Sequence, residues 1–217
     1  MLSHLAKSIK RGDAVLGWRA SIGFLLCALL LAGCSMEGMS RKGGKSSVRV
    51  DRSVETEYKK ALALLQSERY AEAERTLRAL TESQPNLAGP YANLGIVYYR
   101  TDRLEKAEEA FRQSLKLNPS NPAAHNYLGV IHRTNGDFDK ARADYTKALE
   151  IDKNYAEAHL NLGILYDLYL SDLNQALMHY RQYQSLAGQN DKQIAIWIAD
   201  VEQRAQQNAQ KGKAEAR

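Results

Sequence analysis

The chain has 217 residues, of which 44% are hydrophobic, and a formal net charge of +5 at pH 7. Residues 1–33 hold four basic and one acidic side chains, and residues 34–53 hold five basic and two acidic ones, so each segment carries +3 and the remaining residues carry −1. Because the excess positive charge lies outside the long remainder, no basic face with interleaved aromatic residues is left there, and we expect no nucleic-acid partner.

Residues 1–33 have the layout of a secretory signal peptide. Basic residues precede an apolar run from Ile22 to Ala32, which is shorter than the roughly 20 residues that cross a membrane as a helix. The run ends in Leu31-Ala32-Gly33-Cys34, which resembles the lipobox of bacterial lipoproteins. The resemblance implies cleavage before Cys34, a diacylglycerol on its sulfur and acylation of the new amino terminus. A plain secreted protein that is cleaved near Gly33 is the alternative.

A triacylated Cys34 would stay in the membrane, because two or more acyl chains bind firmly where one binds marginally. The sorting rule of enteric-type lipoproteins retains proteins with aspartate after the cysteine in the inner membrane, and here Ser35 follows it. The resemblance therefore implies the periplasmic face of the outer membrane. Residues 34–53, rich in glycine, serine and basic residues, are expected to form a flexible lipidated tether. The tether either stays solvated or lies on anionic lipid headgroups.

The sequence after residue 53 repeats with a period of 34 residues. Gly95, Gly129 and Gly163 each close a Leu-Gly pair, and the side chains around them recur in register. The two regular copies carry Tyr91, Leu94, Tyr98, Ala107, Phe111 and Pro119, and then His125, Leu128, His132, Ala141 and Tyr145. This pattern resembles the tetratricopeptide repeat, a helix-turn-helix unit of 34 residues. Small residues let two antiparallel helices approach closely, and aromatic residues fill the space between units.

The spacing predicts four repeats, which we place at about 54–87, 88–121, 122–155 and 156–190. The first repeat lacks the Leu-Gly pair, as an atypical terminal repeat would. The fourth repeat has one residue added in the turn from Leu168 to Asp172.

Residues 191–217 are expected to form a capping helix and a frayed tail that begins at Gln206. The apolar stripe Ile194, Trp197, Ile198 and Val201 would close the open end of the stack. Trp197 is interpreted as part of this packing, with an anchor for a partner as the alternative. The predicted fold is all-α: a right-handed superhelix, or α-solenoid, of about four hairpins with a C-terminal capping helix.

The positions of the four histidines in the repeats indicate a packing role and not a catalytic or metal-binding one. His125 and His159 stand where Tyr91 stands in its repeat, and His132 stands where Tyr98 does. His125 and His132 are separated by about 10 Å along one helix, too far to share one metal ion. No Ser-His-Asp, Cys-His or paired-carboxylate arrangement stands out from the many acidic residues. We expect no catalytic residue, no metal, no small-molecule substrate and no cofactor apart from the covalent lipid.

Stacked hairpins leave a concave side that is lined by the first helix of each pair. In the tetratricopeptide family, places two, five, nine, twelve and thirteen of each unit line this groove. The resemblance assigns the groove to Tyr58, Leu62 and Leu65; to Ala92, Ile96, Tyr99 and Arg100; to Asn126, Val130, Arg133 and Thr134; and to Leu160, Ile164, Asp167 and Leu168. Such an apolar and aromatic wall suits an extended or helical segment of another protein. A related group of chaperone-binding repeats holds a peptide carboxylate with basic and asparagine side chains, and only Asn93 matches it.

Helical repeats behind a lipid anchor resemble the tetratricopeptide lipoproteins of type IV and tight-adherence pilus systems, in which pilotins help the outer-membrane secretin to assemble. The resemblance implies a scaffold that binds an envelope protein or peptide segment in its groove and is held to the membrane by its lipid. One alternative is an adaptor lipoprotein that recruits periplasmic proteases or cell-wall hydrolases. A second alternative, of a different class, is a catalytic or metal-binding lipoprotein.

Overall fold

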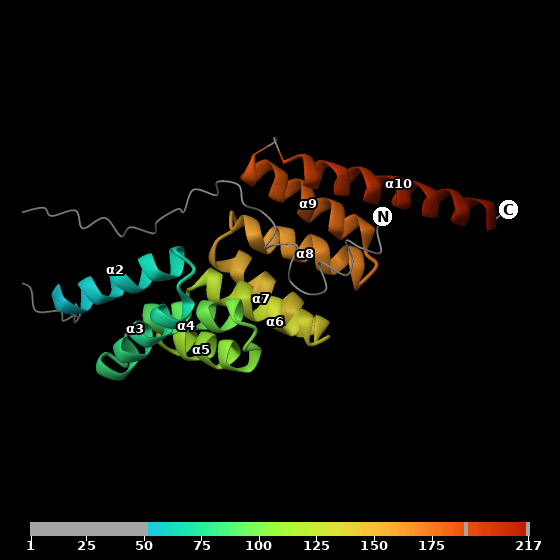
Figure 1. Cartoon of the computed structure of the whole chain (residues 1–217). Helices are drawn as coiled ribbons and strands as arrows, with labels where there is room; N and C mark the ends of the chain where they lie inside the picture. The colour runs from blue at the N-terminus through green and yellow to red at the C-terminus, as the bar shows by residue number, and fades with distance from the viewer. Residues whose placement is uncertain (1–51, 189–190, 216–217) are drawn as a thin grey trace, which may run out of the picture.

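The computed structural model describes residues 52–188 and 191–215 (Figure 1). This part of the chain forms nine α-helices and contains no strand. The helices are α2 (Arg52–Gln66), α3 (Tyr70–Ser83), α4 (Ala88–Arg100), α5 (Leu104–Leu117), α6 (Pro122–Thr134), α7 (Phe138–Ile151), α8 (Ala156–Leu168), α9 (Leu173–Ala187) and α10 (Lys192–Glu215). The predicted all-α class is confirmed. The predicted signal peptide 1–33, Cys34 and the tether up to residue 51 lie outside the described residues. Arg52 and Ser53, which we placed in the tether, are the first residues of α2.

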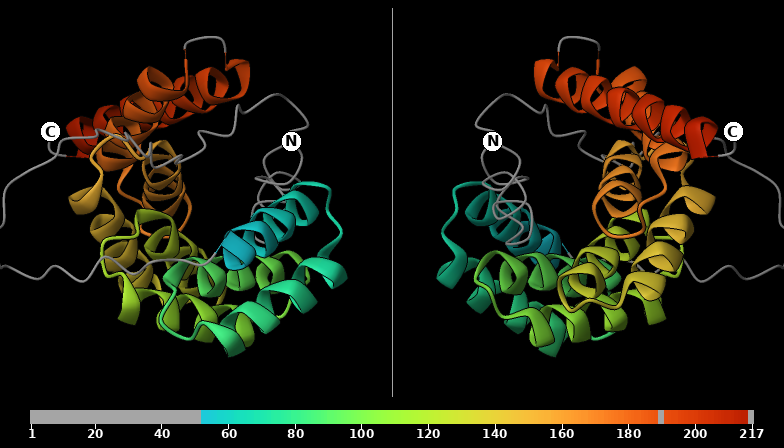
Figure 2. Two further views of the ribbon diagram at one scale, coloured as in Figure 1. Left: turned by 90° about the vertical axis from the view of Figure 1, so that its left-hand side faces the viewer. Right: turned by 90° about the vertical axis from the view of Figure 1, so that its right-hand side faces the viewer.

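The helices pair as antiparallel hairpins that stack in chain order. Each helix packs against the next one along the chain, first within a hairpin and then between hairpins. Figure 2 shows the hairpins following one another around an arc, from α2 at one end to α10 at the other. The predicted right-handed solenoid of four hairpins and a capping helix is therefore confirmed.

The turns inside the hairpins share one backbone conformation. Glu68, Asp102, Gly136 and Ser171 each have a positive φ, between 56° and 85°, just before the second helix begins. This left-handed conformation reverses the chain direction in three residues, 67–69, 101–103 and 135–137. The fourth turn, 169–172, is one residue longer, as the spacing predicts.

The glycines of the Leu-Gly pairs lie under aromatic rings of the second helices. A Cβ atom built on Gly95 would come within 2.8 Å of the Phe111 ring, and one built on Gly129 within 2.5 Å of Tyr145 Cε1. Gly163 has the same relation to Tyr180. Since real Cβ atoms do not approach that closely, the register of each hairpin depends on the missing side chain.

The capping helix α10 takes the place that the first helix of a fifth repeat would occupy. The Oδ1 atom of Asp191 accepts hydrogen bonds from the backbone N–H groups of Gln193 and Ile194 and so caps its first turn. Ile194, Ile198 and Val201 are buried in one cluster with residues of α8 and α9.

The tail differs from our expectation, because α10 continues to Glu215 instead of fraying from Gln206. Residues 206–211 are exposed, and this end of α10 projects beyond the stack in Figure 1. Glutamine, alanine and lysine dominate the segment, and these residues have good helix propensity. Among the described helices, none combines the length and the apolar character that spanning a bilayer requires.

Candidate protein-binding groove

The first helices of the repeats, α2, α4, α6 and α8, form the inner side of the arc. Contacts between helices two places apart in the chain join α2 to α4 and α6 to α8, so first helices of neighbouring repeats approach each other. In a curved stack the elements on the concave side are the ones that crowd together. The concave surface is therefore built from the helices that the sequence assigned to it (Figure 2).

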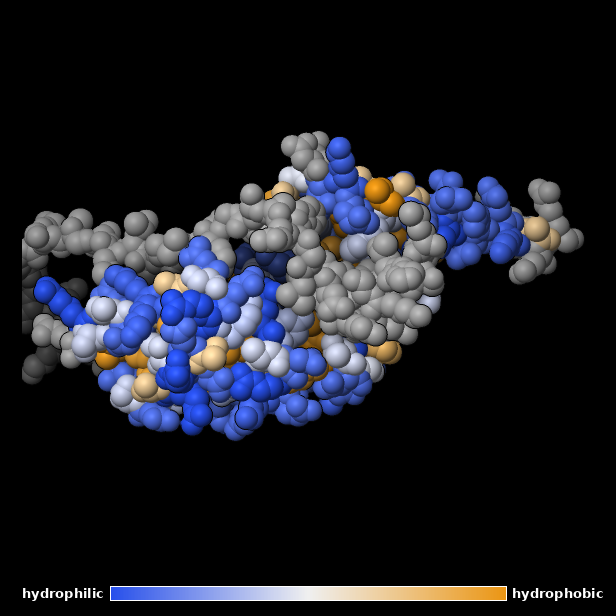
Figure 3. Space-filling view, in the orientation of Figure 1, coloured by the Kyte–Doolittle hydropathy of each residue, from blue (hydrophilic) through white to orange (hydrophobic). Residues whose placement is uncertain are grey.

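Most of the predicted groove residues are accessible on these helices. Leu62 and Leu168, at the two ends of the groove, are 37% and 40% exposed although both are large and apolar. Arg100 and Thr134 are exposed, and the half-buried members are Tyr58, Leu65, Ala92, Ile96, Tyr99, Leu160 and Asp167. The space-filling view shows apolar surface interspersed among hydrophilic side chains on one face of the molecule (Figure 3). Exposed leucines on a concave wall are the kind of surface that a partner segment covers.

Three predicted groove residues are buried between neighbouring first helices, which corrects their assignment. Val130 is 5% exposed and packs in one cluster with Leu162 and Leu165 of α8. Ile164 is 1% exposed and lies in one cluster with residues of α9 and α10. Asn126 is also buried, and its Oδ1 atom accepts a 2.9 Å hydrogen bond from Nδ2 of Asn161. These side chains fill contacts within the helical stack.

Arg133 is the fourth buried member of the predicted groove, at 4% exposure. It occupies place twelve of its repeat, as Tyr99 and Asp167 do in theirs, so the three side chains form one row along the concave side. The carboxylate of Asp167 accepts hydrogen bonds from Tyr180 Oη at 3.3 Å and from Arg204 Nη2 at 2.6 Å. Burial is the main reason that the pKa of the Tyr180 hydroxyl is raised, and the negative charge of Asp167 raises it further.

Two side chains at this surface were missed by the sequence reasoning. Arg204 comes from α10 and pairs with Asp167 of the groove, which follows from α10 standing in for a fifth first helix. Tyr127 was not among the predicted groove residues, yet its ring stacks on Phe111 at 5.0 Å and meets Tyr99 edge-on at 5.3 Å. Its aromatic character was the signal that it fills the contact between the second and third repeats.

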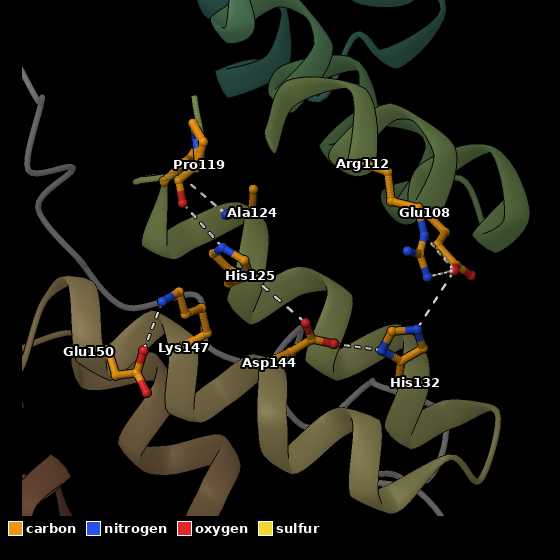
Figure 4. Close-up of polar contacts among 10 residues, drawn as sticks. Glu108, Arg112, Pro119, Ala124, His125, His132, Asp144, Lys147 and Glu150 are labelled. Carbon is orange, nitrogen blue, oxygen red and sulfur yellow. Dashed lines mark hydrogen bonds and ion pairs between the residues drawn. The ribbon is translucent and has the colours of Figure 1, made fainter. Parts of the chain in front are cut away.

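The histidines connect helices, as Figure 4 shows for the third repeat. Nδ1 of His132 donates a 2.6 Å hydrogen bond to Oδ2 of Asp144 on α7, and its Nε2 lies 3.6 Å from Oε1 of Glu108 on α5. His125 Nδ1 lies 3.9 Å from the other oxygen of Asp144. In residues 52–188 and 191–215, no group of three or more His, Cys, Asp and Glu side chains is placed to hold a metal ion.

Comparison with known proteins identifies the repeats. A tetratricopeptide-repeat family model matches residues 58–93 and 92–156. No curated protein matches the sequence.

Several solved structures have the same architecture. The structure of Pseudomonas aeruginosa PilF is 22% identical over 72% of this chain and 71% of its own, with a TM-score of 0.65. TTC0263, described as a thermophilic tetratricopeptide-repeat protein of Thermus thermophilus, is 25% identical over 69% of this chain and 81% of its own, with a TM-score of 0.58. MamA from Desulfovibrio magneticus RS-1 is 19% identical over 64% and 78%, with a TM-score of 0.55. The hairpins within residues 58–156 thus match the tetratricopeptide-repeat family, and the whole helical stack has the fold of these solved structures.

Proposed function

We propose that this protein is a non-catalytic scaffold that holds an envelope protein or peptide segment close to the outer membrane. The observation that carries the proposal is the concave wall of the stack, on which Leu62 and Leu168 remain exposed while the contacts between repeats are filled. Tetratricopeptide repeats generally serve as extended binding surfaces for other proteins. A partner segment would bury these leucines together with the half-buried Ile96 and Tyr99.

Membrane attachment in this proposal rests on Cys34 and the lipobox that precedes it. Replacement of Cys34 by serine should remove the site of acylation and release the protein from the membrane, because the proposed acyl chains are what holds it there. The measurement is fractionation of envelope membranes from cells that express the full chain. Cys27→Ser is the matched control, because Cys27 lies inside the predicted signal peptide and the variant should remain attached. Recovery of the Cys34→Ser protein in the outer membrane would refute the anchor.

The machine that the scaffold serves is proposed to be a type IV pilus or a related secretin-containing system. The resemblance to pilotin-like lipoproteins supports this role, and the architectural similarity to P. aeruginosa PilF is in line with it. In a strain that lacks the protein, we expect the outer-membrane secretin to fail to form its multimer, as measured by semi-denaturing electrophoresis. Expression of the wild type, but not of Cys34→Ser, should restore the multimer. Normal secretin multimers in the deletion strain would reject the pilus role.

A further inference from the structure

A nearly buried guanidinium at the groove lacks a visible counter-charge. Arg133 is 4% exposed, and its Nη1 atom has no hydrogen-bond partner in the described part of the chain. No described carboxylate forms an ion pair with Arg133, and the nearest equivalent acid along the row, Asp167, is occupied by Arg204. Burial of an unpaired charge is costly, and most proteins avoid it unless the group has a function.

A second unsatisfied polar atom lies in the same repeat. The Oη atom of Tyr145 is buried and has no hydrogen-bond partner among the described residues. Burial raises the pKa of this hydroxyl, and the positive charge of Arg133 acts in the opposite direction. The third repeat therefore holds one guanidinium nitrogen, Arg133 Nη1, and one tyrosine hydroxyl that are buried without a hydrogen-bond partner.

The fourth repeat shows how the chain satisfies the equivalent position. Tyr180 has the place of Tyr145, and its Oη atom donates to the carboxylate of Asp167, which Arg204 also binds. A tyrosine hydroxyl and an arginine thus share one carboxylate there. In the third repeat the residue at the place of Asp167 is Arg133, so that place holds a guanidinium where the fourth repeat holds a carboxylate.

We propose that Arg133 receives the carboxylate of an aspartate or glutamate side chain from a partner protein segment docked in the groove. The proposal rests on the proposed scaffold function and adds the chemistry that the partner must carry. Thr134, next along the chain, and Leu168, at the following place of the next repeat, are both exposed. The partner segment therefore combines one acidic side chain with apolar neighbours. The small exposed fraction of Arg133 favours a single slender carboxylate over a polyanion.

The test uses the full-length protein in detergent micelles and peptides selected on it from a phage-displayed random library. We expect the selected peptides to share one acidic residue, and its replacement by glutamine to weaken binding to the wild type by roughly tenfold to a hundredfold, the usual worth of a hydrogen-bonded charge. With the Arg133→Gln protein, the acidic peptide and its glutamine analogue should bind equally. Arg142→Gln is the matched control, because Arg142 is exposed on α7 and pairs only with the local Asp139.

The outcomes separate this inference from the proposed function. Equal acid-to-glutamine ratios for the wild type and Arg133→Gln would overturn the role of Arg133 and leave the scaffold intact. If no selected peptide loses its binding to the Leu168→Asp protein, the proposed groove function itself would be overturned.

A stability measurement guards against a variant that merely misfolds. If Arg133 lacks an internal counter-charge, Arg133→Met should keep or raise the melting temperature, because an apolar side chain of similar length replaces a buried unpaired charge. A melting temperature lowered by many degrees would mean that the chain itself neutralises Arg133, and the inference would fail.

Discussion

Three glycines of the first helices carry much of the packing, because an aromatic ring of the second helix lies directly on each. A methyl group on Gly129 would be placed 2.5 Å from Tyr145 Cε1. We therefore predict that Gly129→Ala lowers the free energy of unfolding by about 1–3 kcal/mol, the usual cost of overpacking, as measured by urea denaturation. The double variant Gly129→Ala with Tyr145→Leu should lose less stability than the sum of the losses of the two single variants, because the smaller leucine leaves room for the methyl group. An unchanged stability of Gly129→Ala would reject the close contact.

The pair His159 and His179 gives the fold a pH dependence. Their Nδ1 atoms lie 3.0 Å apart, and burial, followed by the charge of His159, lowers the pKa of His179 from 6.5 to about 4. The folded protein keeps His179 neutral while the unfolded chain protonates it below pH 6.5. The contribution to stability is therefore complete above pH 6.5 and is lost as the pH falls from 6.5 towards 4.

We predict that the melting temperature of the wild type falls across this pH window and that His179→Phe flattens the fall. Thermal unfolding followed by circular dichroism at closely spaced pH values measures both slopes. Carboxylates with a lowered pKa, such as Glu74, change stability only below the ordinary carboxylate pKa of 4.5. The upper part of the pH window therefore separates the effect of His179 from the effect of these carboxylates. Identical slopes for the two proteins would show that His179 does not titrate as described.

Among the elements, α10 is joined to the stack by two ion pairs of different burial. Arg204 binds Asp167, whose side chain is only 8% exposed, whereas the pair of Arg181 with Glu202 lies at the surface. Loss of the first partner leaves a buried carboxylate with the hydroxyl of Tyr180 alone. We predict that Arg204→Gln costs about 2–3 kcal/mol, as expected for a lost hydrogen-bonded charge, and that Arg181→Gln costs less than about 1 kcal/mol. Equal losses in denaturant titrations would contradict the difference in burial.

The period of 34 residues was sufficient to predict the hairpins, their order and the longer fourth turn, because these follow from which side chains must be small or aromatic. The same period assigned Val130, Ile164 and Asn126 to the open groove, and this was wrong. Whether such a position faces a partner or the next first helix depends on how far neighbouring repeats tilt together, which sequence spacing does not specify. Ile164, for example, is buried in a cluster with residues of α9 and of α10, a helix without a complete repeat.

The missing hydrogen-bond partner of Arg133 could not be predicted from the sequence either. An arginine at place twelve reads as an isolated charge on the groove wall, and its burial and missing acceptor emerge only when the side chains of the neighbouring repeats are placed. The roles of the groove residues in binding and the lipid on Cys34 remain predictions, which the experiments above address.

At the scale of the whole molecule, the proposed scaffold has an inner face that binds and an outer face that does not. Leu62 and Leu168 lie on α2 and α8 at the two ends of the inner face, whereas Met178 on α9 is 52% exposed on a second helix. Exposure alone would make all three equal as contact sites. The scaffold proposal makes them different, because an extended partner segment would span the concave wall.

Photocrosslinking in living cells distinguishes the two faces most directly. A benzophenone amino acid is placed at Leu62, Leu168 or Met178 of the full-length protein, and adducts are identified by mass spectrometry. We predict that Leu62 and Leu168 capture the same envelope protein and that Met178 does not. Adducts confined to Met178, or unrelated and variable adducts from the two inner positions, would contradict the concave groove as the binding surface.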